Sequence, residues 1–247
     1  MTSPTATSPI PPAGSTGRAV LLVHGFTGSP VSLEPWAEDL RRRGFAVSLP
    51  LLPGHGTAWQ DLVSARWPSW SAAVLHAYDE LQRNHDRVYV GALSMGGTLA
   101  LELATHRRPA ALALVNPALS FGDRRARSAG LLRHVVKSTP AIANDIARPG
   151  QDEGAYPRTP VAGVAQLGAL MKHVRRRLPL VVSPIATFTS DTDHIVPPSD
   201  SGVIHARVGT PAEDRRATRL PESYHVATLD YDAETIFAES AEFFGRY

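Results

Sequence analysis

Short, wholly apolar runs alternate along this chain with longer stretches whose apolar side chains recur at helical spacing. The run R-A-V-L-L-V-H-G over residues 18–25 is typical of a strand buried on both faces of a parallel sheet. Residues 31–43 show a helical pattern, and Gly44 follows where a helix end tolerates a positive φ. Further strands are predicted over residues 45–49, 87–92, 110–116, 180–190 and 216–220, and further helices over residues 67–83, 95–106 and 233–244.

This order of strand, helix and strand predicts an α/β fold with a mostly parallel central sheet and helices on both faces. The rhythm changes over residues 119–178, which are rich in Arg, Ala and Gly and in which we expect helical or irregular segments without a strand. We therefore predict a core domain of residues 18–118 and 179–247, interrupted by a small cap over residues 119–178. Residues 1–17 are expected to form a flexible tail.

Composition and charge argue against nucleic-acid binding, metal binding and membrane insertion. The formal net charge is only +2 and the arginines occur in short scattered clusters, so we expect no nucleic-acid partner. The chain has no cysteine, and its 10 histidines show no paired metal-ligand spacing, so neither a metal nor a cofactor is expected. The first residues lack the basic and apolar regions of a secretory signal, and no apolar run could span a membrane. We therefore expect a cytoplasmic protein without stable membrane insertion.

Ser94 lies at a junction between a predicted strand and a predicted helix, in the segment V-Y-V-G-A-L-S-M-G-G. A nucleophilic serine at such a junction needs a sharp, strained turn with small residues two positions before and after it. The usual pattern is G-x-S-x-G, whereas here Ala92 takes the first glycine position and Gly96 the second. An alanine methyl is small, so we predict that Ser94 is the nucleophile of a hydrolase.

A serine nucleophile needs a histidine as general base and a carboxylate that orients the histidine. His225 follows the last predicted strand in P-E-S-Y-H-V-A-T, and D-T-D-H-I-V-P-P follows the strand before it. The chain order of serine, acid and histidine is the one expected for a serine nucleophile at a strand–helix turn. We favour Asp193 as the acid and keep Asp191 as the alternative.

The segment His24–Thr27 follows the first buried strand, where its backbone could fold over the nucleophile. Two backbone N–H groups in such a place would stabilise the negative charge of a tetrahedral intermediate, and we predict that Phe26 and Met95 provide them. His55, in L-P-G-H-G-T, precedes the nucleophile and lies between glycines, so we expect it to stabilise a turn or line the rim of the site.

Taken in order, the segments H-G-F-T-G, L-P-G-H-G-T, L-S-M-G-G, D-H-I-V-P-P and S-Y-H-V-A-T-L-D resemble the bacterial monoacylglycerol lipases and related carboxylesterases of the α/β-hydrolase superfamily. Residues 155–167, A-Y-P-R-T-P-V-A-G-V-A-Q-L, resemble part of the small cap of those lipases. The resemblance implies a Ser94, Asp193 and His225 triad, oxyanion amides at Phe26 and Met95, an apolar acyl tunnel, and a polar pocket for glycerol. It also implies hydrolysis of monoacylglycerols to glycerol and fatty acid.

Other functional hypotheses are consistent with the same residues. A broader carboxylesterase or a thioesterase could use the same serine, acid and histidine on another acyl group, because a fold and a triad fix the chemistry better than the substrate. A non-catalytic ligand-binding protein need not keep all three residues. The partner expected for this chain is therefore a small-molecule acyl ester.

Overall fold

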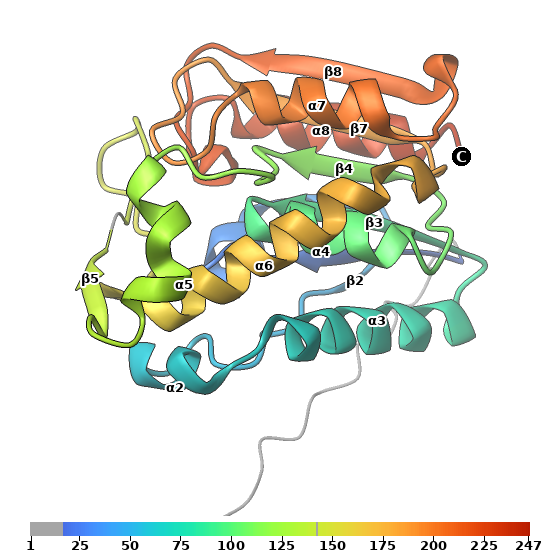
Figure 1. The fold of residues 1–247 in the computed structure, drawn as a ribbon. Helices are drawn as coiled ribbons and strands as arrows, with labels where there is room; N and C mark the ends of the chain where they lie inside the picture. Colours follow the sequence, from blue (N-terminus) through green and yellow to red (C-terminus); the bar gives the residue numbers. More distant parts are fainter. Residues whose placement is uncertain (1–16, 142) are drawn as a thin grey trace, which may run out of the picture.

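The computed structural model describes residues 17–141 and 143–247, so the predicted tail lies outside the described residues except for Gly17. Its centre is a six-stranded, wholly parallel sheet in the order β2-β1-β3-β4-β7-β8 (Figure 1). The strands are β1 (Arg18–Val23), β2 (Ala46–Ser48), β3 (Arg87–Leu93), β4 (Leu112–Val115), β7 (Ile185–Ser190) and β8 (Arg215–Leu220). The predicted α/β fold class and the parallel sheet are confirmed.

Helices cover both faces of the sheet (Figure 1). They are α1 (Glu34–Arg42), α2 (Trp59–Ser64), α3 (Trp67–Asn84), α4 (Met95–Ala104), α5 (Ala129–Leu132), α6 (Val161–Arg177), α7 (Ser199–Arg207) and α8 (Ala233–Phe244). Short 3₁₀ turns are η1 (Pro30–Leu33), η2 (Arg124–Ser128), η3 (Leu178–Leu180), η4 (Ala212–Asp214) and η5 (Ala227–Leu229). None of the helices described over 17–141 and 143–247 is long and apolar enough to cross a membrane.

Burial of the central strands explains why their sequences read as continuous apolar runs. From Ala19 to Val23 every residue of β1 has no exposed surface, because alternate side chains enter two different cores. One core contains side chains of β1, α3, α4 and α6, and the other contains side chains of β1, α1 and α8. The predicted end of the first helix is confirmed, since Gly44 has a φ of 85°.

Between β4 and β7 the structure differs from expectation. Residues 119–178 contain two short strands, β5 (Ser138–Pro140) and β6 (Arg158–Pro160), which pair in an antiparallel ladder, so the expectation of no strand there was wrong. Three-residue strands that end in proline carry no apolar alternation by which a sequence could reveal them. The same segment ends in α6, which packs on α4 and supplies the crossover from β4 to β7 (Figure 1).

The parallel sheet brings all of its carboxyl ends to one edge, where the connecting loops meet. The loops after β1, β3, β7 and β8 carry Phe26, Ser94, Asp193 and His225 respectively. Two further helices, α2 and α7, were not expected from the sequence but leave this arrangement unchanged. The topology therefore places the four predicted regions at the same edge.

Candidate active site

Ser94 occupies a strained turn between β3 and α4. Its φ of 56° and ψ of −119° lie outside the regions that a residue with a side chain normally adopts. Such strain is concentrated at functional sites. The turn packs closely: a Cβ on Gly25 would lie 3.4 Å from the Ser94 Cβ, and one on Gly96 would lie 2.0 Å from the Val23 carbonyl oxygen. The Ser94 residue is 8% exposed and lines a cavity.

Ala92 fits the position where glycine was expected. It is fully buried within β3, where it pairs with Val23 of β1 and Leu114 of β4. The tight contact falls one residue earlier, because a Cβ on Gly91 would lie 2.6 Å from a Leu22 methyl carbon. The alanine is therefore accommodated without distortion of the strand pairing.

Asp193 and His225 form a buried hydrogen-bonded pair. His225 Nδ1 lies 2.8 Å from one carboxylate oxygen of Asp193. The other oxygen accepts backbone N–H groups from Ile195 and Val196, each at 2.8 Å. These three donors fix the carboxylate, and the carboxylate fixes the orientation of the imidazole with Nε2 free for another partner.

Asp191, the alternative acid, takes part in a different contact. Its carboxylate forms an ion pair with Arg219, and its side chain is 41% exposed, whereas the Asp193 side chain is 2% exposed. The geometry therefore selects Asp193 as the partner of His225.

The electrostatic surroundings raise the pKa of His225. Burial by itself lowers the pKa, but the hydrogen bond and negative charge of Asp193, followed by the charges of Glu153 and Asp145, outweigh burial. The imidazolium form is thus stabilised, as a general base requires when it accepts a proton during the reaction.

Asp145 and Glu153 were not expected at the site from the sequence. Asp145 accepts the backbone N–H of His225 at 3.2 Å and contacts the His194 ring at 2.7 Å. Glu153 is held by reciprocal hydrogen bonds with Asn144, and burial raises the pKa of its carboxyl group despite the hydrogen bond from the Asn144 N–H. Both belong to the irregular segment between β5 and β6, and no motif in that segment marks them.

Asn116 is a third residue that sequence reasoning missed. It follows β4 with a φ of 43°, and its amide nitrogen donates to the His225 carbonyl oxygen at 2.8 Å. Its amide oxygen accepts the Ser190 N–H at 2.8 Å, which ties the end of β7 to the loop that carries His225. The sequence predicts its position at the end of a strand. Its hydrogen-bond partners could not be predicted, because they lie more than 70 residues away along the chain.

The loop after β1 lies against the Ser94 turn. Thr27 has a φ of 62°, and its carbonyl oxygen accepts the Tyr156 N–H at 3.1 Å. The Phe26 ring packs edge-on against Trp70 with the centroids 6.1 Å apart. Met95 is the buried first residue of α4, so its N–H belongs to the helix turn that has no intrahelical acceptor. The fold thus brings the two segments predicted to hold an oxyanion to either side of Ser94.

His24, the first residue of this loop, and His55 are both buried. His55 contacts the Pro53 carbonyl oxygen at 3.2 Å, as expected of a turn-stabilising residue, and its ring meets that of His24 edge-on. Burial lowers the pKa of His55 to about 4, and burial followed by the charge of His55 lowers that of His24 to about 3. Both imidazoles are therefore neutral near pH 7 and unsuited to exchange protons there.

A cavity of about 620 Å³ opens beside Ser94 and His225. Its walls are mostly apolar and include Leu132, Leu167 and Ile195, whereas its charged lining includes Asp145 and Glu153. This volume and character suit a ligand with an alkyl chain and a small polar head. In the part of the chain that the structure describes, no group of three or more His, Cys, Asp or Glu side chains could hold a metal ion.

Comparisons with known proteins agree with this geometry. Residues 14–232 match the family Hydrolase_4, described as Serine aminopeptidase, S33. The chain is 40% identical over 230 residues to the thermostable monoacylglycerol lipase of Bacillus sp. (strain H-257), which covers 92% of this chain and 90% of that protein. It is 23% identical over 227 residues to a carboxylesterase of Bacillus subtilis (strain 168), which covers 92% of each.

A solved structure from work on the metagenome-derived lipolytic enzymes LipS and LipT matches with a TM-score of 0.90 and 33% identity, covering 95% of each chain. The resemblance inferred from the sequence motifs is therefore confirmed. The chain belongs to the Hydrolase_4 family and is a serine hydrolase of the α/β-hydrolase fold.

Proposed function

We propose that this hydrolase cleaves monoacylglycerols to glycerol and fatty acid through an acyl-enzyme on Ser94. In this proposal Ser94, Asp193 and His225 form the catalytic triad, and the N–H groups of Phe26 and Met95 form the oxyanion hole. The observation that carries it is the buried Asp193–His225 pair at 2.8 Å, with His225 lining the same cavity as the strained Ser94.

In the first half of the reaction, His225 Nε2 accepts the Ser94 hydroxyl proton as the oxygen attacks the ester carbonyl carbon. Asp193 stabilises the resulting imidazolium and keeps its Nδ1 proton directed at the carboxylate. The Phe26 and Met95 amides stabilise the oxyanion, each by about 100- to 1000-fold in rate. His225 then returns the proton to the leaving glycerol oxygen, which leaves the acyl group esterified to Ser94.

The second half repeats these steps with water. His225 removes a proton from the water as the water oxygen attacks the acyl carbon, and returns it to Ser94 Oγ as the ester bond breaks. The products are the fatty acid and the free serine.

The cavity supports a lipid ester as substrate, since its apolar walls suit an alkyl chain and Asp145 and Glu153 offer acceptors for glycerol hydroxyls. The named activity of the relative that is 40% identical supports the same choice. We propose further that residues 119–178 act as the cap of this cavity. Within that segment α6 lines the cavity and also serves as the crossover helix between β4 and β7. A cytoplasmic location without stable membrane insertion belongs to the same proposal.

An alkyl fluorophosphonate tests the chemistry. We expect a covalent adduct at Ser94 by peptide mass spectrometry and no measurable esterase activity in Ser94→Ala. Retention of full activity by Ser94→Ala would exclude the proposed mechanism.

A substrate series tests the specificity. We expect higher kcat/KM for 1-monoacylglycerols than for thioesters of the same acyl chain. Thioester values higher by orders of magnitude would instead make the protein a thioesterase, and equal turnover of many esters would make it a broader carboxylesterase.

A further inference from the structure

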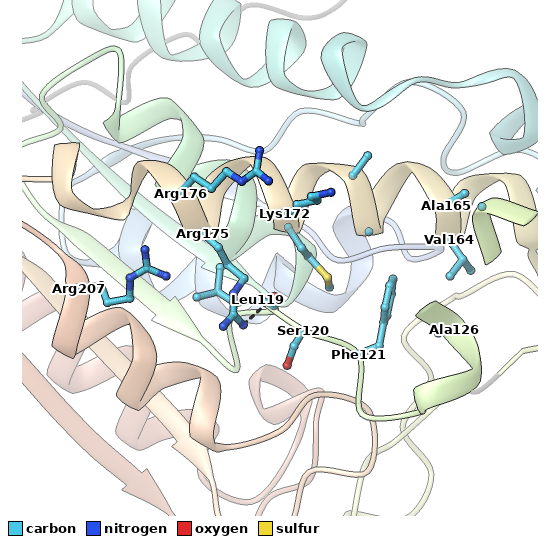
Figure 2. A pocket seen from close by; sticks show the side chains of 14 residues that line it. Leu119, Ser120, Phe121, Ala126, Val164, Ala165, Lys172, Arg175, Arg176 and Arg207 are labelled. Atoms are coloured by element: carbon cyan, nitrogen blue, oxygen red, sulfur yellow. Dashed lines mark hydrogen bonds between the residues drawn. The ribbon is translucent and has the colours of Figure 1, made fainter. Parts of the chain in front are cut away.

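A second cavity lies on the other side of the wall formed by Phe121 and Met171, outside the site described above. Its volume is about 670 Å³, within the range of small-molecule sites. It lies between α6, the chain after β4 and α7, as Figure 2 shows. Its lining contains neither Ser94 nor His225.

The half of this cavity near Phe121 is apolar and adjoins the acyl cavity. Phe121, Ala126, Val164 and Met171 line both spaces. The Phe121 ring packs over Gly168, where a Cβ would lie 3.1 Å from the ring edge. A ligand's alkyl chain could therefore lie along this wall and bury apolar surface on it.

The other half is cationic. Lys172, Arg175 and Arg176 extend from α6, and Arg207 extends from α7 on the facing side (Figure 2). Arg175 is half-buried and donates to the Leu119 carbonyl oxygen at 3.5 Å, whereas the other three side chains are exposed. Among the residues that the structure describes, no carboxylate forms an ion pair with any of these four, and none lines the cavity.

The carboxylate beneath the cavity floor is already satisfied. Asp200 accepts the Leu119 N–H at 2.8 Å, the Ser120 N–H at 2.6 Å and the Ser120 hydroxyl at 2.8 Å. Among the described residues, the lining at this end therefore carries four cationic side chains and no carboxylate, whereas the other end is apolar. The acyl cavity differs, because Asp145 and Glu153 line it and its Arg125 forms an ion pair with Asp123 at 3.2 Å.

We propose that this second cavity binds the anion of a fatty acid, with the carboxylate at the end lined by Lys172, Arg175 and Arg207 and the alkyl chain along Phe121 and Val164. Arginine and lysine form charge-assisted hydrogen bonds with a carboxylate, and the shared wall provides a surface for the chain. The choice of this anion rests on the function proposed above, because fatty acid is a product of that hydrolysis. Asp145 and Glu153, which line the acyl cavity with His225, disfavour the same anion once it has formed.

Binding of decanoate to protein whose acyl cavity is filled tests the proposal. A decylphosphonate adduct on Ser94 occupies the acyl cavity, and decanoate is then titrated calorimetrically below its micellar concentration. We expect one decanoate to bind the adduct, with uncharged decanol binding at least about tenfold more weakly, the loss expected for charge-assisted hydrogen bonds. An adduct that binds no decanoate overturns the proposal.

Matched substitutions locate the site. Lys172→Gln with Arg207→Gln is expected to weaken decanoate binding by about tenfold or more, whereas Arg66→Gln with Arg108→Gln, two exposed arginines outside both cavities, should leave it unchanged. Equal losses in the two double variants overturn the proposal, because the effect would then be one of net charge.

Ala169 offers a second and gentler pair of variants, because it is exposed on α6 and lines only the second cavity. Ala169→Glu should abolish decanoate binding by placing a carboxylate among the cations, whereas Ala169→Gln adds the same bulk without charge and should bind. Equal binding by the two variants refutes the assignment. If no adduct forms on Ser94, the proposed function fails. Decanoate binding to the two Ala169 variants of the untreated protein still shows whether the second cavity binds the anion.

Discussion

Replacement of Asp193 by Asn removes the charge that orients His225 and changes little else in volume. The carboxylate now accepts three N–H groups, from Ile195, Val196 and His225. An asparagine keeps one acceptor oxygen and turns an NH₂ group toward one of these donors. If the oxygen stays with the two backbone groups, His225 Nδ1 faces a donor and the imidazole must adopt the other tautomer.

The expected loss follows from that tautomer. With the proton on Nε2, His225 can no longer accept the Ser94 proton, and changes of this kind cost about 10³- to 10⁴-fold in kcat, or about 4–5.5 kcal/mol of transition-state stabilisation. Asp193 also raises the pKa of His225. Residual activity should therefore show its acidic limb at lower pH than the parent enzyme.

Steady-state hydrolysis of a 1-monoacylglycerol across pH 5 to 9 measures both effects. Asp191→Asn is the matched control, because it removes a carboxylate two residues away that pairs with Arg219 at the surface. An exposed ion pair contributes little, so this variant should keep kcat/KM within about twofold. Urea unfolding of both variants separates a catalytic loss from loss of the fold.

Two results would refute this reasoning. Full activity in Asp193→Asn would show that His225 needs no carboxylate at this position. An equal loss in Asp191→Asn would show that the measured effect comes from the loop and not from the buried pair.

Three further predictions concern the same site. Glu153→Gln removes a charge that raises the pKa of His225. Because the neutral imidazole is the active base, the acidic limb of the kcat/KM profile should move to lower pH. An acidic limb that stays at the same pH would contradict this prediction. Gly96→Ala should lower the free energy of unfolding in urea by roughly 3 kcal/mol or more, because the new Cβ meets the Val23 carbonyl oxygen. Gly202→Ala, in open space on α7, should raise it by about 0.5–1 kcal/mol. Equal effects of the two substitutions would argue against the steric account. Ala92→Gly should cost roughly 1 kcal/mol of stability and leave kcat/KM within a few-fold, since the methyl is buried without strain; a large gain in activity would show that the alanine does constrain the turn.

Most strands could be predicted because burial on both faces leaves a direct mark on the sequence. β1, β3 and β7 lie inside their predicted ranges or within a residue of them, and Gly44 ends its helix as expected. β5 and β6 could not be predicted, because each is three residues long and acquires its structure only by pairing with the other across the intervening segment.

The site divides in the same way. Ser94, Asp193 and His225 could be proposed because strand ends and chain order constrain them. Asp145, Glu153 and Asn116 could not, because an acidic or amide side chain in an irregular segment looks the same whether it faces solvent or a buried histidine. The choice between Asp193 and Asp191 also required coordinates, since the two share a loop.

The sequence alone determined the fold class, the strand–helix turn at Ser94 and the chain order of the three residues of the proposed triad, because each depends on local pattern or on topology that parallel strands impose. Only the tertiary structure decided which carboxylate meets His225, which charges raise its pKa, and where the two cavities lie on either side of Phe121 and Met171. Those features arise from contacts between segments 30 to more than 100 residues apart, and their geometry exists only once the chain has folded.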